Sequence, residues 1–293
     1  MKRIAVLAAL MIVALPLAGF SVEPAKDPNP AQGSPDGLPN NATGGPDAFG
    51  YTFADSAEAN CPFQFVDITA TGTSITSGDD SSSGAVGLTA PHDFYGELNT
   101  SLNMATNGYI TNDGTDTGPD LSNDCPLPAP PSTGGGARMY VTHDDLITTD
   151  GLIEYFASCP RANANCSIAE DCTIFQWNGV THFGGGGPWN QQAILYHQSG
   201  DMVFQVGAGN PETGSGSTTG IQNVTATDGL TYACNVAGSI LDNSGVCFFH
   251  PNPSPACAGI ATVAIPTANN FGLLALLVGL AVAAFFMLRR RFA

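Results

Sequence analysis

The chain has 293 residues, of which 43% are hydrophobic and only 11% are charged, and its formal net charge at pH 7 is −17. All 25 acidic residues lie within residues 22–264, between the two apolar end segments. That part of the chain has only three basic residues, Lys26, Arg138 and Arg161. Binding to a phosphate backbone needs clustered Lys and Arg, so this charge balance excludes nucleic acid as a partner and remains compatible with divalent cations.

Residues 1–21 have the pattern of a secretory signal peptide. Lys2 and Arg3 precede a short apolar run at 4–17, and small residues follow it. A basic start, a short apolar run and small residues before a cleavage point are typical of export signals that are removed. The alternative, a retained membrane helix, is less favoured because the run is short and a polar, proline-rich stretch follows.

Composition divides the rest of the chain into a leader, one domain and a spacer. Residues 22–45 are rich in Pro, Gly, Asn and Asp and contain almost no large apolar side chain, so we expect a flexible leader. Residues 46–250 are numerous enough for one domain with a real core. Residues 251–264 contain a short proline spacer.

The sequence of the domain predicts an all-β fold, an antiparallel β-sandwich. Short apolar runs alternate with turn residues, and no stretch between the termini has a sustained helical period. His197 to Asp201 predicts a tight hairpin between two strands, and Asn107-Gly108 predicts a turn. The strands are expected at 63–68, 139–141, 152–156, 173–177, 193–196, 202–206, 230–234 and 246–249.

The last segment, residues 265–293, predicts a membrane anchor. Residues 271–288 contain no charged side chain, and a helix of this length reaches about 27 Å, close to the thickness of a bilayer core. Arg289, Arg290 and Arg291 follow at once. Clustered arginines favour the cytoplasmic side, so the N-terminus and the domain are expected outside the membrane.

The same segment resembles a bacterial sorting signal. Ile265, Pro266 and Thr267, then Phe271 and Gly272, then the apolar span and the arginines, are similar to the IPTL-CTERM tail of surface proteins, although residues 268–271 depart from its usual motif. The resemblance implies recognition by an exosortase-like membrane transpeptidase that processes the tail. The alternative is an ordinary tail anchor, which has the same topology.

The domain itself resembles the nidogen-like extracellular β-domain. The similarity covers about 47–250 and rests on an acidic turn at Asp79-Asp80, Phe94-Tyr95-Gly96, Thr106-Asn107-Gly108-Tyr109, HDDL at 143–146, FQWNGVTHFG at 175–184 and the hairpin that follows. Thr106 and His143 replace the usual Ser and Trp, and a Cys-containing insertion lies at 159–172. The resemblance implies the fold and an extracellular setting, with no shared catalytic activity.

Eight cysteines in an exported domain predict disulfide bonds. We expect Cys234 to pair with Cys247 on neighbouring strands, two of the three cysteines in the insertion to pair, and Cys61 to pair with Cys125. The competing interpretation, a zinc site, is less favoured because no C-x-x-C pair occurs and the compartment is oxidising. The cysteines are Cys61, Cys125, Cys159, Cys166, Cys172, Cys234, Cys247 and Cys257.

One loop has the oxygen donors of a calcium site. Asn112, Asp113, Asp116 and Asp120 are spaced so that they can surround Ca²⁺, but the loop lacks the bidentate Glu of an EF-hand. Asn and Asp are equally common in turns because their side chains bond to the local backbone, and that interpretation is favoured. Asp79-Asp80 and Asp144-Asp145 are weaker candidates. No other cofactor is expected.

The remaining candidates concern catalysis and sugar binding. The chain has no G-x-S-x-G elbow, so its five histidines define no nucleophilic triad and we expect no enzymatic activity. A pair of carboxylates for glycoside hydrolysis stays open among the many acids. Six aromatic residues can form a carbohydrate platform, with Trp177 expected in the core and Trp189 exposed; the others are Tyr140, Tyr155, Phe175 and Phe183.

The sequence therefore predicts an exported surface protein, anchored in the cell envelope and without catalytic activity, with an adhesive, matrix or structural role. Its partners would be the membrane, the transpeptidase and surface glycans or matrix. The alternative is a tethered β-sandwich that binds or hydrolyses glycans.

Overall fold

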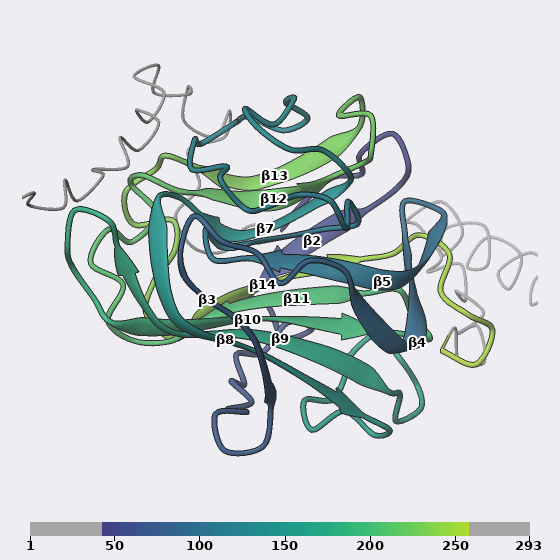
Figure 1. Cartoon of the computed structure of the whole chain (residues 1–293). Helices are drawn as coiled ribbons and strands as arrows, with labels where there is room; N and C mark the ends of the chain where they lie inside the picture. The colour runs from purple at the N-terminus through teal and green to yellow at the C-terminus, as the bar shows by residue number, and fades with distance from the viewer. Residues whose placement is uncertain (1–42, 258–293) are drawn as a thin grey trace, which may run out of the picture.

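The computed structural model describes residues 43–257, and within this range every regular element is a β-strand. The fourteen strands form two antiparallel sheets (Figure 1). The eight-stranded sheet has the order β1 (Thr43–Gly44), β2 (Thr52–Asp55), β14 (Ser244–Phe249), β11 (Met202–Val206), β10 (Trp189–Tyr196), β9 (Cys172–His182), β8 (Leu146–Phe156) and β3 (Thr73–Asp79). The six-stranded sheet has the order β13 (Gly229–Cys234), β12 (Thr218–Gln222), β7 (Arg138–His143), β6 (Tyr109–Thr111), β5 (Glu97–Ala105) and β4 (Val86–Phe94).

The main core lies between the two sheets, which are stacked face to face in Figure 1. Side chains at alternate positions of each strand enter it, as the pleat of a β-strand requires. From the eight-stranded sheet come Phe175, Trp177 and Phe204, and from the six-stranded sheet Met104 and Met139, all at most 2% exposed. The predicted all-β sandwich is therefore confirmed for the described residues.

The outer face of the eight-stranded sheet is buried as well. A second apolar cluster on this face includes Ile174, Ile194 and Val203, together with Ile68 from the connection between β2 and β3. Because both faces of the central strands are covered, β11 is buried at all five positions. This explains why β10 and β11 contain consecutive apolar residues, 193–196 and 202–204, where a half-exposed strand would alternate.

Residues 62–68 cross this outer face without forming a strand. Gln205, Gln192 and Gln176 stand side by side on β11, β10 and β9, in register. The backbone N–H of Gln64 donates to Gln205 Oε1 at 2.7 Å, and the N–H of Ile68 donates to Gln176 Oε1 at 2.9 Å. With its amide nitrogen toward the Val66 carbonyl, Gln192 donates to that oxygen at 2.9 Å and accepts from the Val66 N–H at 3.0 Å.

These three residues, which we call the glutamine ladder, take the place of a neighbouring strand. Alternate backbone groups of the segment bond to side chains of three different strands, so the segment lies across the sheet. The strand predicted at 63–68 is thus wrong as a strand, because its backbone pairs with side chains. The segment is nevertheless extended, and its side chains alternate between the two sides as the sequence pattern indicates.

All eight cysteines form disulfide bonds: Cys61–Cys247, Cys125–Cys234, Cys159–Cys172 and Cys166–Cys257. The expected pair within the insertion is confirmed by Cys159–Cys172, and the zinc interpretation of the cysteines is wrong. The pairs Cys234–Cys247 and Cys61–Cys125 are also wrong. The reason is topological, because β13 lies at the edge of one sheet and β14 lies inside the other.

The other predicted strands fall on β7 to β11, β13 and β14, and the hairpin at 197–201 joins β10 to β11. Residues near the expected domain ends are held to the sandwich, since β1 pairs with β2 and Cys257 is buried in its bond to Cys166. Among the described residues no helix is long and apolar enough to cross a membrane. The signal peptide at 1–21, the span at 271–288 and the whole sorting motif lie outside the described residues.

Candidate ligand-binding site

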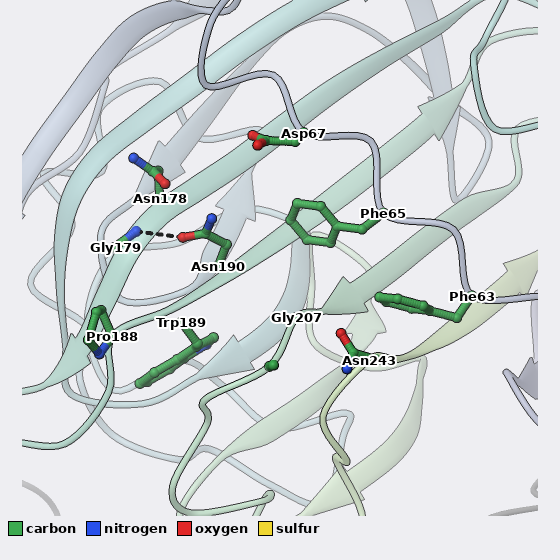
Figure 2. Close-up of a pocket in the computed structure, with 11 residues that line it drawn as sticks. Phe63, Phe65, Asp67, Asn178, Gly179, Pro188, Trp189, Asn190, Gly207 and Asn243 are labelled. Atoms are coloured by element: carbon green, nitrogen blue, oxygen red, sulfur yellow. Dashed lines mark hydrogen bonds between the residues drawn. The ribbon is translucent and has the colours of Figure 1, made fainter.

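A pocket of about 490 Å³ opens between residues 62–68 and one end of the central strands of the eight-stranded sheet (Figure 2). Its walls come from segments far apart in the sequence: the segment on the glutamine ladder, β9, β10, the residues after β11 and the residue before β14. The lining residues are Phe63, Phe65, Asp67, Asn178, Gly179, Pro188, Trp189, Asn190, Gly207, Ala208 and Asn243.

One wall consists of Phe63, Phe65 and Asp67. In an extended segment, residues two apart point to the same side, so bonding residues 64, 66 and 68 to the ladder turns the rings of Phe63 and Phe65 away from it. The Asp67 carboxylate lies on the solvent side as well, although its Oδ1 still accepts from Gln176 Nε2 of the ladder. Figure 2 shows Asp67 projecting toward Asn178, Phe65 toward Asn190, and Phe63 toward Gly207 and Asn243. Both rings are half-buried and Asp67 is exposed, so apolar ring surface and a carboxylate face solvent together.

Amide side chains form the opposite side of the pocket. Asn190 accepts a hydrogen bond from the N–H of Gly179 through Oδ1 at 2.8 Å, which fixes the side chain and leaves its Nδ2 hydrogens for other partners (Figure 2). Asn178 lies on the neighbouring strand, and Asn243 borders the pocket from the turn before β14. The pocket therefore offers donors and acceptors around an aromatic wall.

Asp67 carries the negative charge of the pocket. Its Oδ1 accepts from the N–H and hydroxyl of Thr69 and from Gln176 Nε2. These hydrogen bonds, the Thr69 N–H first, stabilise the ionised form and lower the pKa of Asp67. The carboxylate is a permanent acceptor at neutral pH, so anionic ligands are disfavoured.

The aromatic residues singled out in the sequence are only partly at this pocket. Trp177 is fully buried, and its indole N–H donates to the carbonyl of Ala105 at 2.7 Å, so the prediction that it is core is confirmed. Trp189 was expected to be exposed, and this is wrong: it is 2% exposed. It begins β10 and packs into the main core, and only a small part of its side chain borders the pocket.

The four remaining members of the aromatic set do not form a platform. Tyr140 and Phe175 are fully buried, whereas Phe183 is half-exposed in the loop after β9. Tyr155 is half-buried and borders a different, smaller hollow. Sequence reasoning missed Phe63 and Phe65 as site residues, because a strand prediction gave no reason for both rings to face solvent.

The calcium candidates lie in another part of the fold, on the outer face of the six-stranded sheet. Asp116 Oδ2 is 2.8 Å and Asp120 Oδ2 is 3.4 Å from the buried guanidinium of Arg138. Arg138 also stands 4.1 Å above the ring of Tyr109. Burial raises the pKa of Asp120 to about 6, against the lowering effects of His143 and Arg138.

The other two candidates serve local structure. Asp113 Oδ1 accepts from the N–H and hydroxyl of Thr115, and Asn112 Oδ1 accepts from the N–H of Ala137. Two of the four residues, Asp116 and Asp120, thus pair with an arginine, and the other two accept hydrogen bonds from neighbouring segments. Calcium binding here stays a prediction, and the positive charge of Arg138 between the two buried carboxylates disfavours it.

The Asn107 side chain explains several of the sequence motifs at once. Its Nδ2 donates to Asp80 Oδ1 at 2.7 Å and to the carbonyl of Asp120 at 2.9 Å, and its Oδ1 accepts from the N–H of Leu146 at 2.9 Å. The acidic turn, the T-N-G-Y motif and the HDDL motif therefore meet at one buried amide, which gives them a structural role.

These motifs lie within a region that matches a known protein family. A family model described as NIDO related matches residues 50–245, which is most of the chain and nearly the whole sandwich. The chain belongs to the NIDO-related family. The expected nidogen-like domain is therefore confirmed. No curated protein and no solved structure matches the chain.

Within this NIDO-related domain, the motifs around Asn107 lie apart from the pocket, whereas Asn178 and Gly179 of the FQWNGVTHFG motif line it. The motifs around Asn107 join the two sheets, whereas Phe63, Phe65 and Asp67 lie on the connection between β2 and β3. One wall of the pocket thus comes from a connecting segment and the other from the strands of the sandwich, and loops on a rigid scaffold commonly carry binding function.

Proposed function

We propose that this NIDO-related protein is an exported, non-catalytic binding protein of the bacterial cell envelope, and that its pocket binds a neutral saccharide. The observation that carries the proposal is the wall of Phe63, Phe65 and Asp67 opposite Asn178 and Asn190. Sugar rings present apolar C–H faces and dense hydroxyl groups. Aromatic faces, amides and a carboxylate are the groups that can contact both.

The charge of the pocket narrows the class of ligand. Asp67 stays ionised, and the 25 acidic residues of the chain exceed its basic residues by a wide margin. Acidic saccharides would meet repulsion from this field. Neutral hexoses, whose hydroxyl groups can donate to Asp67 and accept from asparagine amides, fit better.

The envelope part of the proposal rests on the two termini and the disulfides. Four disulfide bonds are stable in an oxidising compartment outside the cytoplasm. The signal-like residues 1–21 would deliver the chain there. The IPTL-CTERM-like tail at 265–293 would hold it until a transpeptidase processes it.

A glycan array tests the binding function. We expect the protein to bind neutral glycans and the Phe65→Ala variant to lose most of this signal, because it removes one aromatic face. Phe183→Ala is the matched control, since Phe183 is exposed on a loop outside the pocket. Loss of signal in both variants, or in neither, would contradict the proposal.

Cell fractionation tests the envelope part. Cells would express the full chain or a chain that ends before Ile265. We expect the full chain in the envelope fraction and the shortened chain in the medium. Retention of the shortened chain at the surface would refute the anchoring role of the tail and leave saccharide binding untouched.

A further inference from the structure

Three separate segments bring an imidazole and two carboxylates together next to Trp189. His182 is the last residue of β9, Asp144 lies between β7 and β8, and Glu212 lies between β11 and β12. His182 Nδ1 is 3.2 Å from Asp144 Oδ2 and 3.7 Å from Glu212 Oε1. One donor atom of each residue lies within 4.8 Å of the other two.

These separations are close to those between ligands of one metal ion. Donor atoms about 2.0–2.1 Å from a tetrahedral Zn²⁺ stand about 3.4 Å from one another. The two measured distances lie on either side of that value. The two carboxylate oxygens also lie within 4.8 Å of each other, so one ion bound by all three atoms would leave its fourth position for water.

The charge of the cluster also favours a cation. Two carboxylates face one imidazole, so even a protonated ring leaves an excess of negative charge. The two arginines of the described residues are committed elsewhere: Arg138 bonds to Asp116 and Asp120, and Arg161 bonds to the carbonyl of Pro62 and the hydroxyl of Tyr196. A divalent ion would balance the cluster without the side chain of an arginine or lysine.

The surroundings hold the three groups in place. The ring of His182 packs against Trp189, with centroids 4.9 Å apart. Glu212 Oε2 lies against Gly216, where a Cβ would stand 2.6 Å from it. The side chain of His182 is 11% exposed and that of Glu212 is 31% exposed, which leaves a route for an ion from solvent.

We propose that Asp144, His182 and Glu212 form a binding site for a divalent transition metal ion, with Zn²⁺ as the best-fitting ion. An imidazole nitrogen with two carboxylates suits zinc, whereas calcium takes six to eight oxygen ligands and gains nothing from the nitrogen. The site would tie the loop after β9 to the loop after β11. This inference is independent of saccharide binding.

Isothermal titration of the untagged, oxidised, full-length protein in detergent with ZnCl₂ tests the site. We expect one saturable site per chain in the wild type. His182→Gln and Glu212→Gln should each weaken binding by at least about 100-fold, because the loss of a direct ligand exceeds the 10–100-fold cost of an outer-shell change. Co²⁺ should give a d–d absorption band that both variants abolish.

Two control variants have matched chemistry. His197→Gln removes a half-buried imidazole bonded to Thr173 at 2.8 Å, and Glu154→Gln removes a carboxylate bonded to Thr71. Both should retain the wild-type zinc affinity. The absence of a saturable zinc site, equal losses in His182→Gln and His197→Gln, or displacement of zinc by equimolar Ca²⁺ would overturn the proposal.

Discussion

Gln205 and Gln64 are joined by two hydrogen bonds across 141 residues of sequence. The N–H of Gln64 donates to Gln205 Oε1 at 2.7 Å, and Gln205 Nε2 donates to the carbonyl of Gln64 at 2.9 Å. A like reciprocal pair joins Gln192 to Val66, and Gln176 accepts from the Ile68 N–H while it donates to Asp67 Oδ1. Together these bonds fix which residues of the segment point outward. The pocket exists because Phe63, Phe65 and Asp67 are the ones that do.

Breaking this pair should loosen the wall of the pocket. Gln205→Leu leaves the N–H and carbonyl of Gln64 without their partner, so we expect a loss of about 1–3 kcal/mol in the free energy of unfolding. Urea unfolding measures it. Gln198→Leu, on the hairpin after β10, is the control and should change stability by less than about 0.5 kcal/mol. Equal losses in the two variants would contradict the role of the ladder.

Arg138 should be essential to the fold through its charge. Arg138→Met keeps much of the side-chain volume and leaves Asp116 and Asp120 buried without their cation, so we expect destabilisation by about 3–5 kcal/mol. Adding Asp116→Asn and Asp120→Asn to the same chain should recover part of this loss, because the uncompensated charges are removed. Urea unfolding of the wild type, Arg138→Met and the triple variant measures these changes. An Arg138→Met variant as stable as the wild type would contradict the role of the arginine.

His92 should make the fold sensitive to acid. Burial lowers its pKa to about 3, and the neighbouring His197 adds to the effect. The unfolded chain takes up the proton near pH 6.5, before the folded chain does, so the stability that neutral His92 provides is lost as the pH falls below 6.5. At pH 5 the loss from this residue should be about 2 kcal/mol.

The test compares wild type with His92→Leu at pH 7.5 and pH 5. The decrease in unfolding free energy between the two conditions should be about 2 kcal/mol smaller in the variant. Carboxyl groups with raised pKa values, such as Asp120, act in the opposite direction in both proteins and cancel in the comparison. Identical pH dependence in the two proteins would show that His92 does not carry the effect.

The disulfides should differ in their contribution to stability. Cys159–Cys172 closes a loop of 13 residues, and replacing both cysteines with serine should cost about 3 kcal/mol. Cys61–Cys247 joins residues 186 apart and tethers the start of the covering segment, so its removal should cost more, up to about 5 kcal/mol. Thermal unfolding of the two double variants gives the order, and the reverse order would contradict it.

The class of fold and most strands could be predicted from the sequence because those strands are apolar and bounded by turns. Met202 to Val206 is the clearest case, since the predicted and observed strands coincide. Strands such as β3 and β5 were missed as strands because their exposed faces are rich in Ser, Thr and Asn. Their position is fixed by hydrogen bonding to neighbouring strands, and local composition carries no information about which strands those are.

The pocket was harder to predict than the fold. Three glutamines on separate strands carry no local signal that they will bond to one distant segment, and their alignment across β9, β10 and β11 becomes visible only once the register is known. The disulfide partners fail for the same reason, because Cys234 and Cys247 are close in sequence and lie in different sheets. Trp189 follows a glycine-rich loop, and only the tertiary structure shows that it turns inward.

The most direct test of the central claim is an NMR titration of the protein with the neutral oligosaccharide that binds best on the array. The account predicts that the largest shifts fall on the side-chain amides of Asn178 and Asn190 and on the rings of Phe63 and Phe65. It also predicts that Phe65→Ala weakens the affinity on the order of tenfold. Shifts confined to residues outside the pocket, or an affinity that Phe65→Ala leaves unchanged, would contradict it.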